Sequence, residues 1–307
     1  MHSHSNDHDH HRHGQLPGAG RAFAIGIALN IAFVLVEWTC GVLANSLSLV
    51  ADATHNFSDV LGLALAWGAM MLARRPPSMR FTYGLRGSTV LAALANAMLL
   101  LVATGGIAWE AILRFQNHGA VDAPVVIWVA ALGVAINAGT AMLFMAGRKT
   151  DLNIRGAYLH MAADAGVSLG VVVAGIGMAY TGWTWLDPVA SLLIVMVICI
   201  STWRLLRDSV KLALHAAPEN VDPQEVRRYL AGLPGVAEVH DLHIWAMSTT
   251  ETALTVHLVM PAGHPGDEFF SHVVRHVEER FHIGHATVQI ETGTSANPCI
   301  LAPDHVV

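Results

Sequence analysis

Two copies of one pattern, a histidine followed four residues later by an aspartate, stand in otherwise apolar segments of the chain. The first copy is His55 with Asp59, and the second is His160 with Asp164. Residues spaced i, i+4 lie one turn apart on the same face of a helix. Two such helices facing each other would bring two imidazoles and two carboxylates around one point, and these groups are ligands for a four-coordinate metal ion.

These ionisable residues belong to a chain that is too apolar for an ordinary soluble domain. Hydrophobic residues make up 53% and charged residues 13% of its 307 residues, against about a quarter charged in typical soluble domains. An ionised carboxylate costs about 2.5–3.5 kcal/mol at the centre of a bilayer, so Asp59 and Asp164 need compensation. A bound Zn²⁺ would supply it. The competing structural interpretation is a hydrogen-bonded His–Asp pair that pins its own helix.

The donor set favours zinc as the ion and a transporter as the function class. Two nitrogen and two oxygen donors suit Zn²⁺, with Cd²⁺ and Co²⁺ as alternatives, whereas Mg²⁺ and Ca²⁺ prefer oxygen alone. The cysteines Cys40, Cys199 and Cys299 are far apart, which indicates neither a disulfide framework nor a thiolate zinc site. The HExxH motif is absent and four protein ligands would close the coordination shell, which disfavours a zinc hydrolase. The sequence has no basic face interleaved with aromatic residues, so it does not predict nucleic-acid binding.

Six apolar segments are long enough to cross a bilayer, which requires about 20 residues. They cover residues 22–44, 46–73, 87–113, 123–147, 156–180 and 183–205. Basic residues gather before the first segment, between the second and third, between the fourth and fifth, and after the sixth. By the positive-inside rule, these loops and both termini are cytoplasmic. We therefore expect a multi-pass protein of the cell inner (cytoplasmic) membrane.

The chain divides into four predicted parts. Residues 1–20 are rich in histidine and lack a signal-peptide pattern, so we expect a disordered cytoplasmic tail. Its histidines suggest loose metal capture, with an inert solubilising tail as the alternative. Residues 21–207 form a six-helix transmembrane domain, residues 208–293 a small cytoplasmic α+β domain, and residues 294–307 a C-terminal tail. The α+β domain is predicted to contain a helix, two strands, a second helix and a third strand in that order.

Six segments give the chain a resemblance to the cation diffusion facilitator family, specifically its bacterial zinc-exporting branch. They are the His-rich N-terminus, residues 51–59, Arg75-Pro76-Pro77, residues 160–164, His240-Asp241-Leu242-His243-Ile244-Trp245 and residues 287–291. The resemblance implies a homodimer with six spans per protomer and a cytoplasmic ferredoxin-like domain. It also implies export of Zn²⁺ from the cytoplasm in exchange for protons, with the transport site at the two His–Asp pairs.

The resemblance further implies regulatory metal ions in the cytoplasmic domain. Their ligands would be His240, His257, His285 and Glu291, while Gln289 stands where some relatives have a ligating histidine. Strand parity agrees for three of them. His285 and Glu291 share the polar face of the third strand, and His257 lies opposite its apolar neighbours. His240 shares parity with the apolar residues of its strand, so its place depends on the resemblance.

Competition between protons and metal gives the expected mechanism. A metal ion binds only deprotonated ligands, and imidazole titrates near pH 6.5, so protons can displace the ion. We therefore expect proton-coupled zinc export by alternating access, with Zn²⁺, protons, the lipid bilayer and a second copy of the chain as partners, and with no further cofactor. The alternatives are a membrane-anchored zinc sensor and a transporter that prefers Cd²⁺ or Co²⁺.

Overall fold

The computed structural model describes residues 19–115, 119–145, 152–293 and 299–303. Nearly all of the predicted N-terminal tail and most of the predicted C-terminal tail therefore lie outside the described residues. The described residues form two compact units. The first unit contains the residues up to Val60 together with Ala103–Ile198, and the second contains Leu61–Val102 and the residues from Cys199 onward.

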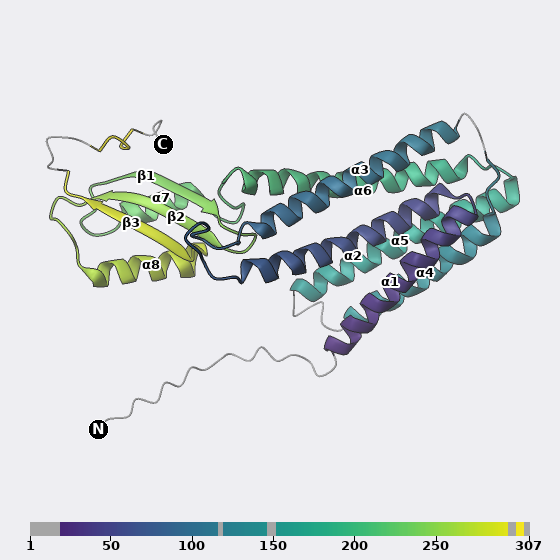
Figure 1. The fold of residues 1–307 in the computed structure, drawn as a ribbon, viewed down its shortest axis with the longest axis horizontal. Coiled ribbons are helices and arrows are strands. Elements are labelled where there is room, and N and C mark those ends of the chain that lie inside the picture. The colour runs from purple at the N-terminus through teal and green to yellow at the C-terminus, as the bar shows by residue number, and fades with distance from the viewer. Residues whose placement is uncertain (1–18, 116–118, 146–151, 294–298, 304–307) are drawn as a thin grey trace, which may run out of the picture. The chain divides into compact units, whose positions relative to one another are not determined.

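Six long helices occupy the predicted apolar segments (Figure 1). They are α1 (Ala19–Leu43), α2 (Leu47–Ala73), α3 (Ser88–Arg114), α4 (Ala123–Phe144), α5 (Leu152–Thr181) and α6 (Leu186–Ala213). The helices α2 to α6 are long and apolar enough to cross a membrane, and the described apolar part of α1 is Ile31–Leu43. The predicted helical membrane domain is thus confirmed, with α6 continuing past residue 207.

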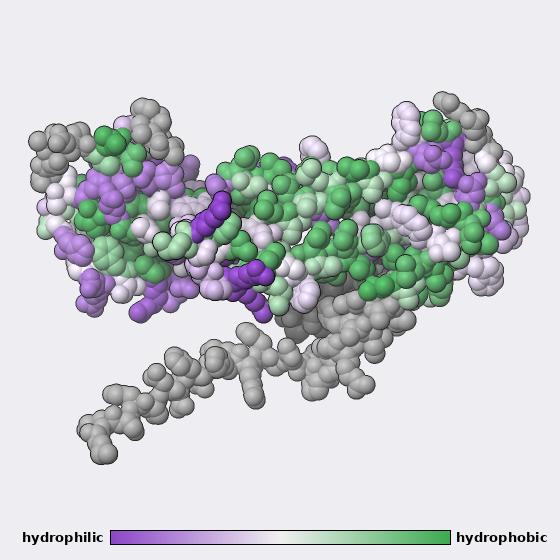
Figure 2. Space-filling model, viewed as in Figure 1, coloured by the Kyte–Doolittle hydropathy of each residue, from purple (hydrophilic) through white to green (hydrophobic). Residues whose placement is uncertain are grey.

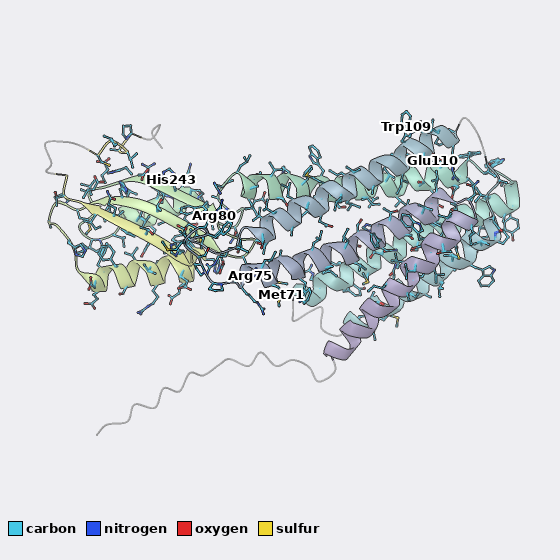
Figure 3. The ribbon with its side chains drawn as sticks, viewed as in Figure 1. Met71, Arg75, Arg80, Trp109, Glu110 and His243 are labelled. Atoms are coloured by element: carbon cyan, nitrogen blue, oxygen red, sulfur yellow. The ribbon has the colours of Figure 1, made fainter. Side chains whose placement is uncertain are left out.

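The outward surface of these helices is also apolar. Met71 on α2 and Trp109 on α3 are 51% and 65% exposed and project away from the ribbon (Figure 3). Figure 2 shows hydrophobic residues over much of the surface of the long helices. Large exposed apolar side chains are costly in water, so this surface is suited to contact with lipid.

Close helix packing in the first unit depends on small residues. Helix α4 lies along α5, and α1 contacts α4. A Cβ added at Gly133 of α4 would lie 2.8 Å from Phe33 Cζ, and one added at Gly175 of α5 would lie 2.8 Å from Ile127 Cγ1. Real Cβ atoms do not approach other atoms so closely. Glycine at these two places therefore allows the helix backbones to approach each other.

The C-terminal part of the chain forms the predicted α+β domain. Strand β1 (Glu238–Ala246) pairs antiparallel with β2 (Thr252–Val259), which pairs parallel with β3 (His285–Glu291). Helix α7 (Pro223–Ala231) precedes the sheet, and α8 (Asp267–Phe281) connects β2 to β3 (Figure 1). Asp222 caps α7 by accepting a hydrogen bond from the Gln224 amide at 2.9 Å. The order helix, strand, strand, helix, strand is confirmed.

Both helices of this domain pack on one face of the sheet. Their buried residues, Val226 and Leu230 on α7 and Val273, Val277 and Phe281 on α8, share one core with the sheet residues Leu254, Val256 and Leu258. Side chains alternate between the two faces of a strand. The opposite face is therefore free of these helices, and it carries the polar residues of β2 and β3.

Candidate metal centres

The two predicted His–Asp pairs lie in the first unit on two different helices. His55 and Asp59 are on α2, and His160 and Asp164 are on α5. Each pair projects from one helix face, as the i, i+4 spacing predicts. The structure brings all four side chains together.

Each imidazole Nε2 atom faces a carboxylate of its own helix and a carboxylate of the other helix. His55 Nε2 lies 4.0 Å from Asp59 Oδ2 and 3.4 Å from Asp164 Oδ1. His160 Nε2 lies 3.2 Å from Asp59 Oδ2 and 3.6 Å from Asp164 Oδ2. In a tetrahedral zinc site with bonds of about 2.0–2.2 Å, donor atoms lie about 3.3–3.6 Å apart. Donor atoms of Asp59, His160 and Asp164 all lie within 4.8 Å of one another, and His55 contacts both of these carboxylates, at 3.4 and 4.0 Å.

The four side chains differ in exposure. Asp164 is 3% and His55 16% exposed, whereas Asp59 is 34% and His160 44% exposed. The ring is therefore closed around Asp164 and open around His160. A site that binds an ion reversibly needs both properties, because protein ligands must replace the water around the ion and the ion must still be able to leave.

Two further buried carboxylates lie beside the ring. Asp52 precedes His55 by about one turn of α2 and accepts a 2.8 Å hydrogen bond from Ser168 on α5. Glu37 on α1 accepts a 3.2 Å hydrogen bond from Asn56 Nδ2. Both carboxylates are fully buried. The Asp52–Ser168 hydrogen bond joins α2 and α5 about one turn from the ring, which indicates a role in holding the spacing of these two helices.

A buried aspartate at the start of α6 fixes the start of α2, the helix that carries the first His–Asp pair. Asp187 accepts hydrogen bonds from the Leu47 amide at 2.7 Å and the Ser48 amide at 3.2 Å. It also accepts hydrogen bonds from the Ser46 and Ser48 hydroxyls, each at 2.6 Å. Asp187 is an N-terminal cap supplied by another helix, which satisfies amides that would otherwise lack partners. No spacing pattern in the sequence reveals this cap, because its partners lie about 140 residues away.

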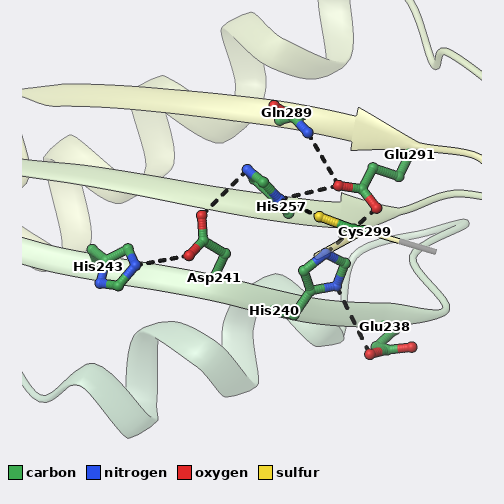
Figure 4. Close-up of polar contacts among 8 residues, drawn as sticks. All are labelled: Glu238, His240, Asp241, His243, His257, Gln289, Glu291 and Cys299. Carbon is green, nitrogen blue, oxygen red and sulfur yellow. Dashed lines mark hydrogen bonds and ion pairs between the residues drawn. The ribbon is translucent and has the colours of Figure 1, made fainter. Parts of the chain in front are cut away.

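The cytoplasmic domain contains a second cluster on the open face of its sheet (Figure 4). His240 on β1 pairs with His257 on β2, and His257 pairs with Gln289 on β3. Glu291 is two residues beyond Gln289 and therefore shares its face. The three adjacent strands thus place His240, His257 and Glu291 side by side.

A bulge in β1 explains how His240 reaches this face. Between His240 and His243 the strand pairing shifts by one residue, and Asp241 has the left-handed φ of 51°. The extra residue reverses the alternation of side chains along the strand. His240 and Leu242 therefore do not share a face, although simple parity places them together.

A fourth donor, Cys299, joins this cluster from beyond β3. His240 Nε2 lies 3.4 Å from Glu291 Oε2, and His257 Nδ1 lies 3.0 Å from Glu291 Oε1. Cys299 Sγ lies 3.7 Å from His257 Nδ1. The four donor atoms all lie within 4.8 Å of one another. Cys299 is not among the ligands that the sequence predicts, because the chain lacks a CxxC motif and its three cysteines are far apart.

Asp241 orients the imidazole ring of His257. His257 Nε2 lies 3.3 Å from Asp241 Oδ2, and His243 Nε2 lies 2.8 Å from Asp241 Oδ1. A carboxylate that receives the N–H of one ring nitrogen leaves the other nitrogen free to bind a metal. Asp241 therefore favours the tautomer of His257 in which Nδ1 is unprotonated and points toward Glu291 and Cys299.

The charge state of Glu291 suits a metal ligand. Desolvation acts to raise the pKa of its carboxyl group, but hydrogen bonds from Cys299 and Gln289 and the nearby His240 and His257 lower the pKa below its ordinary value. The group is therefore a carboxylate throughout the neutral range. Gln289 donates a 3.1 Å hydrogen bond to Glu291 Oε1 and thus supports the carboxylate.

The structure places His285 away from the cytoplasmic cluster. It pairs with Ala253 at the beginning of β3, whereas Glu291 is at the end of that strand. Its ring instead contacts Tyr83, with 5.6 Å between ring centroids. Of the four cytoplasmic ligands that the resemblance implied, His240, His257 and Glu291 come together in this chain, and His285 does not join them.

Two family models match the two parts of this chain. The model of a cation efflux transmembrane domain matches residues 23–212, and the model of a cation efflux protein cytoplasmic domain matches residues 218–293. The metal-bound C-terminal domain of the CzcD transporter from Cupriavidus metallidurans has a solved structure. It is 39% identical, covers 23% of this chain and 99% of its own, and has a TM-score of 0.22.

Relatives of similar length are metal transporters. Zinc transporter ZitB of Escherichia coli is 36% identical over 94% of this chain and 92% of its own. Metal cation efflux system protein CzcD of Cupriavidus metallidurans is 35% identical over 91% and 89%. A cadmium, cobalt and zinc/H(+)-K(+) antiporter of Bacillus subtilis is 32% identical over 91% and 92%. With membrane helices, a matching transmembrane family model and these relatives, the chain belongs to the cation efflux family of membrane transporters and is not an enzyme.

Proposed function

We propose that this protein exports Zn²⁺ from the cytoplasm in exchange for protons and holds the ion with His55, Asp59, His160 and Asp164. The observation that carries the proposal is the ring of alternating imidazoles and carboxylates, with contacts of 3.2–4.0 Å, drawn from two apolar helices. Structural His–Asp pairs would need no partner on the other helix. Here each imidazole faces both carboxylates, which is the arrangement that a shared ion stabilises.

The chemistry of the ring favours zinc among divalent ions. Two imidazole nitrogens and two carboxylate oxygens match the ligands and the tetrahedral geometry of Zn²⁺. Relatives named for cadmium, cobalt and zinc make Cd²⁺ and Co²⁺ the alternative cargoes. Both ions accept the same donors, so their uptake would change the selectivity assigned here and leave the site unchanged.

Proton coupling follows from the same ligands. Zinc binds only deprotonated imidazole and ionised carboxylate, so ligand protonation and metal binding exclude each other. In the proposed cycle the ring takes Zn²⁺ from the cytoplasmic side, the helices reorient, and protons from the outer side displace the ion. The name of the Bacillus subtilis relative, an antiporter, supports an exchange mechanism.

The proposed setting is the inner membrane, with both termini in the cytoplasm and two copies of the chain together. Arg75 and Arg80, in the loop after α2, are among the basic residues that indicate this orientation (Figure 3). The cytoplasmic cluster of His240, His257 and Glu291 is proposed as a regulatory zinc site. Its occupancy would neutralise charge in the cytoplasmic domains of the dimer and make export responsive to cytoplasmic zinc.

Proteoliposomes test the transport proposal. When a Zn²⁺ gradient is imposed, the full-length protein should move protons in the direction opposite to the zinc flow. Asp164→Asn should abolish both fluxes while leaving the protein folded. Glu110→Gln is the matched control, because Glu110 is an exposed acid on α3 that pairs with Arg114, four residues away, at 3.4 Å (Figure 3). Zinc binding without zinc or proton movement would refute the exporter and favour the membrane-anchored sensor.

A further inference from the structure

Cys299 lies at the cytoplasmic cluster although it is eight residues beyond the end of β3. Its sulfur is 3.7 Å from His257 Nδ1, and it also donates a hydrogen bond to the Glu291 carboxylate. A cysteine on an unrelated tail could lie anywhere on the domain surface. Its sulfur instead joins the three donors that the adjacent strands bring together.

An independent observation at the same place is the state of His240. This side chain is only 4% exposed, and neither of its ring nitrogens has a hydrogen-bond partner. Its Nδ1 atom lies 3.8 Å from Glu238 Oε1, and its Nε2 atom is aimed at Glu291 Oε2 across 3.4 Å. A buried polar group without a hydrogen bond is costly, and a metal ion between Nε2 and the Glu291 carboxylate would remove that cost.

The distances suit a four-ligand site. Glu291 contacts His257 through Oε1 at 3.0 Å and His240 through Oε2 at 3.4 Å, and Cys299 contacts His257 at 3.7 Å. One donor atom from each of the four residues lies within 4.8 Å of the others. With zinc bonds of about 2.0–2.1 Å to nitrogen or oxygen and about 2.3 Å to sulfur, tetrahedral edges span about 3.3–3.6 Å. Of these three contacts, the one made by the Cys299 sulfur is the longest, as the larger radius of sulfur requires.

We propose that Cys299 is the fourth ligand of a closed site for a thiophilic divalent cation, Zn²⁺ or Cd²⁺, with His240, His257 and Glu291. This inference rests on the proposed metal binding by the cytoplasmic domain and extends it. A three-ligand site keeps an open position for water, whereas four protein ligands make a closed site of the structural kind. The thiolate also shifts preference toward softer ions.

The proposed ligation has a structural consequence for the end of the chain. Three ligands lie on the sheet, and the fourth lies in sequence beyond it. Metal binding would therefore tie the segment around Cys299 to the open face of the sheet. The cytoplasmic domain would carry a metal-dependent contact formed entirely within one chain, in addition to any contact between two copies.

Cobalt provides a direct test in the purified full-length protein. A thiolate bound to Co²⁺ gives a sulfur-to-metal charge-transfer absorption, which imidazole and carboxylate ligands do not give. The ring on α2 and α5 has no thiol donor, so the band reports cysteine ligation alone. The titration uses a Cys40→Ala, Cys199→Ala background, because those two residues lie on α1 and α6 and are not in the cluster.

The expected result is a charge-transfer band that saturates with Co²⁺ in this background and vanishes in Cys299→Ser and in His257→Ala. His55→Ala is the matched control and should keep the band, because it changes only the other site. Cys299→Ser should also weaken Zn²⁺ binding at the cytoplasmic site by about 100-fold. This factor corresponds to about one quarter of the binding free energy of a four-ligand zinc site, since one of the four ligands is lost. If the background variants fold poorly, the difference spectrum between native protein and Cys299→Ser gives the same readout.

Two outcomes separate this inference from the proposed function. Co²⁺ binding that depends on His257 but gives no charge-transfer band would overturn the role of Cys299 and leave the three-residue cytoplasmic site standing. A normal band in a protein that transports no zinc would support Cys299 as a ligand and refute the exporter.

Discussion

Replacing Asp187 with alanine should destabilise the transmembrane domain without touching a metal ligand. The carboxylate accepts hydrogen bonds from the Leu47 and Ser48 amides at the start of α2, and all of these groups are buried. The two serine hydroxyls lie 3.1 Å apart and can bond to each other in its absence. The two backbone amides have no such replacement.

The size of the effect follows from those two amides. A hydrogen bond to a charged group contributes about 1.5–3 kcal/mol, so Asp187→Ala should cost about 3–6 kcal/mol. Asp187→Asn keeps one acceptor oxygen and should cost about half as much. For a domain of this size, each kcal/mol corresponds to about 2–4 °C in melting temperature. The apparent melting temperature of Asp187→Ala should therefore fall by roughly 6–24 °C.

Thermal unfolding of the detergent-solubilised protein measures this effect. Asp122→Ala is the matched control, because Asp122 also caps a helix but is exposed and accepts one hydrogen bond, from Val125 at 3.3 Å. Its loss should cost about 1 kcal/mol. Equal, small shifts in the two variants would refute the assignment of Asp187 as the buried anchor of α2.

Three further results are expected. Gly133→Ala should lower the melting temperature, because overpacking against Phe33 costs about 1–3 kcal/mol. Gly139→Ala is the control and should be neutral or stabilising, because the space at its Cβ position is open. A similar effect of both substitutions in a thermal melt would contradict the close packing at Gly133. Asp241→Ala should weaken cytoplasmic zinc binding about 10–100-fold through loss of the His257 tautomer, measured by competition with a chelator; an unchanged affinity would show that Asp241 does not orient the ligand. Zinc binding by the same cluster should weaken as the pH falls, because protons compete with the metal for its ligands. Because the pKa of Glu291 is lowered, loss of its charge should not contribute until the pH is below the ordinary glutamate range; equilibrium dialysis at stepped pH that showed no loss of zinc binding in acid would contradict this competition.

The sequence predicted the features that depend on local spacing. Each His–Asp pair lies on one helix face because the helix has a fixed period of 3.6 residues. The six apolar segments are helices because a helix satisfies its own backbone hydrogen bonds, which lipid cannot do. The α+β order likewise follows from apolar alternation. The assignment of individual ligands stays a prediction, which the geometry of the ring now makes specific.

Other features depend on contacts that local patterns do not encode. The bulge at Asp241 reverses strand parity, so the face of His240 could not be read from alternation. Asp187 and Cys299 act on residues far away in the sequence, and neither belongs to a spacing motif. His285 shows the opposite case: it has the right parity, yet it lies four residues from Gln289 along β3 and so misses the cluster.

The alternating ring of imidazoles and carboxylates has an electrical consequence. With Zn²⁺ bound, two ionised aspartates offset the two positive charges and both imidazoles are neutral. In the proposed exchange, one proton on each imidazole would replace zinc, and the same two aspartates would offset two imidazolium groups. Both forms of the ring carry no net charge, so a membrane potential would exert no force on either when the site reorients. A transporter that exchanges ions at this ring would be driven by the pH gradient, and its rate would not depend on the membrane potential.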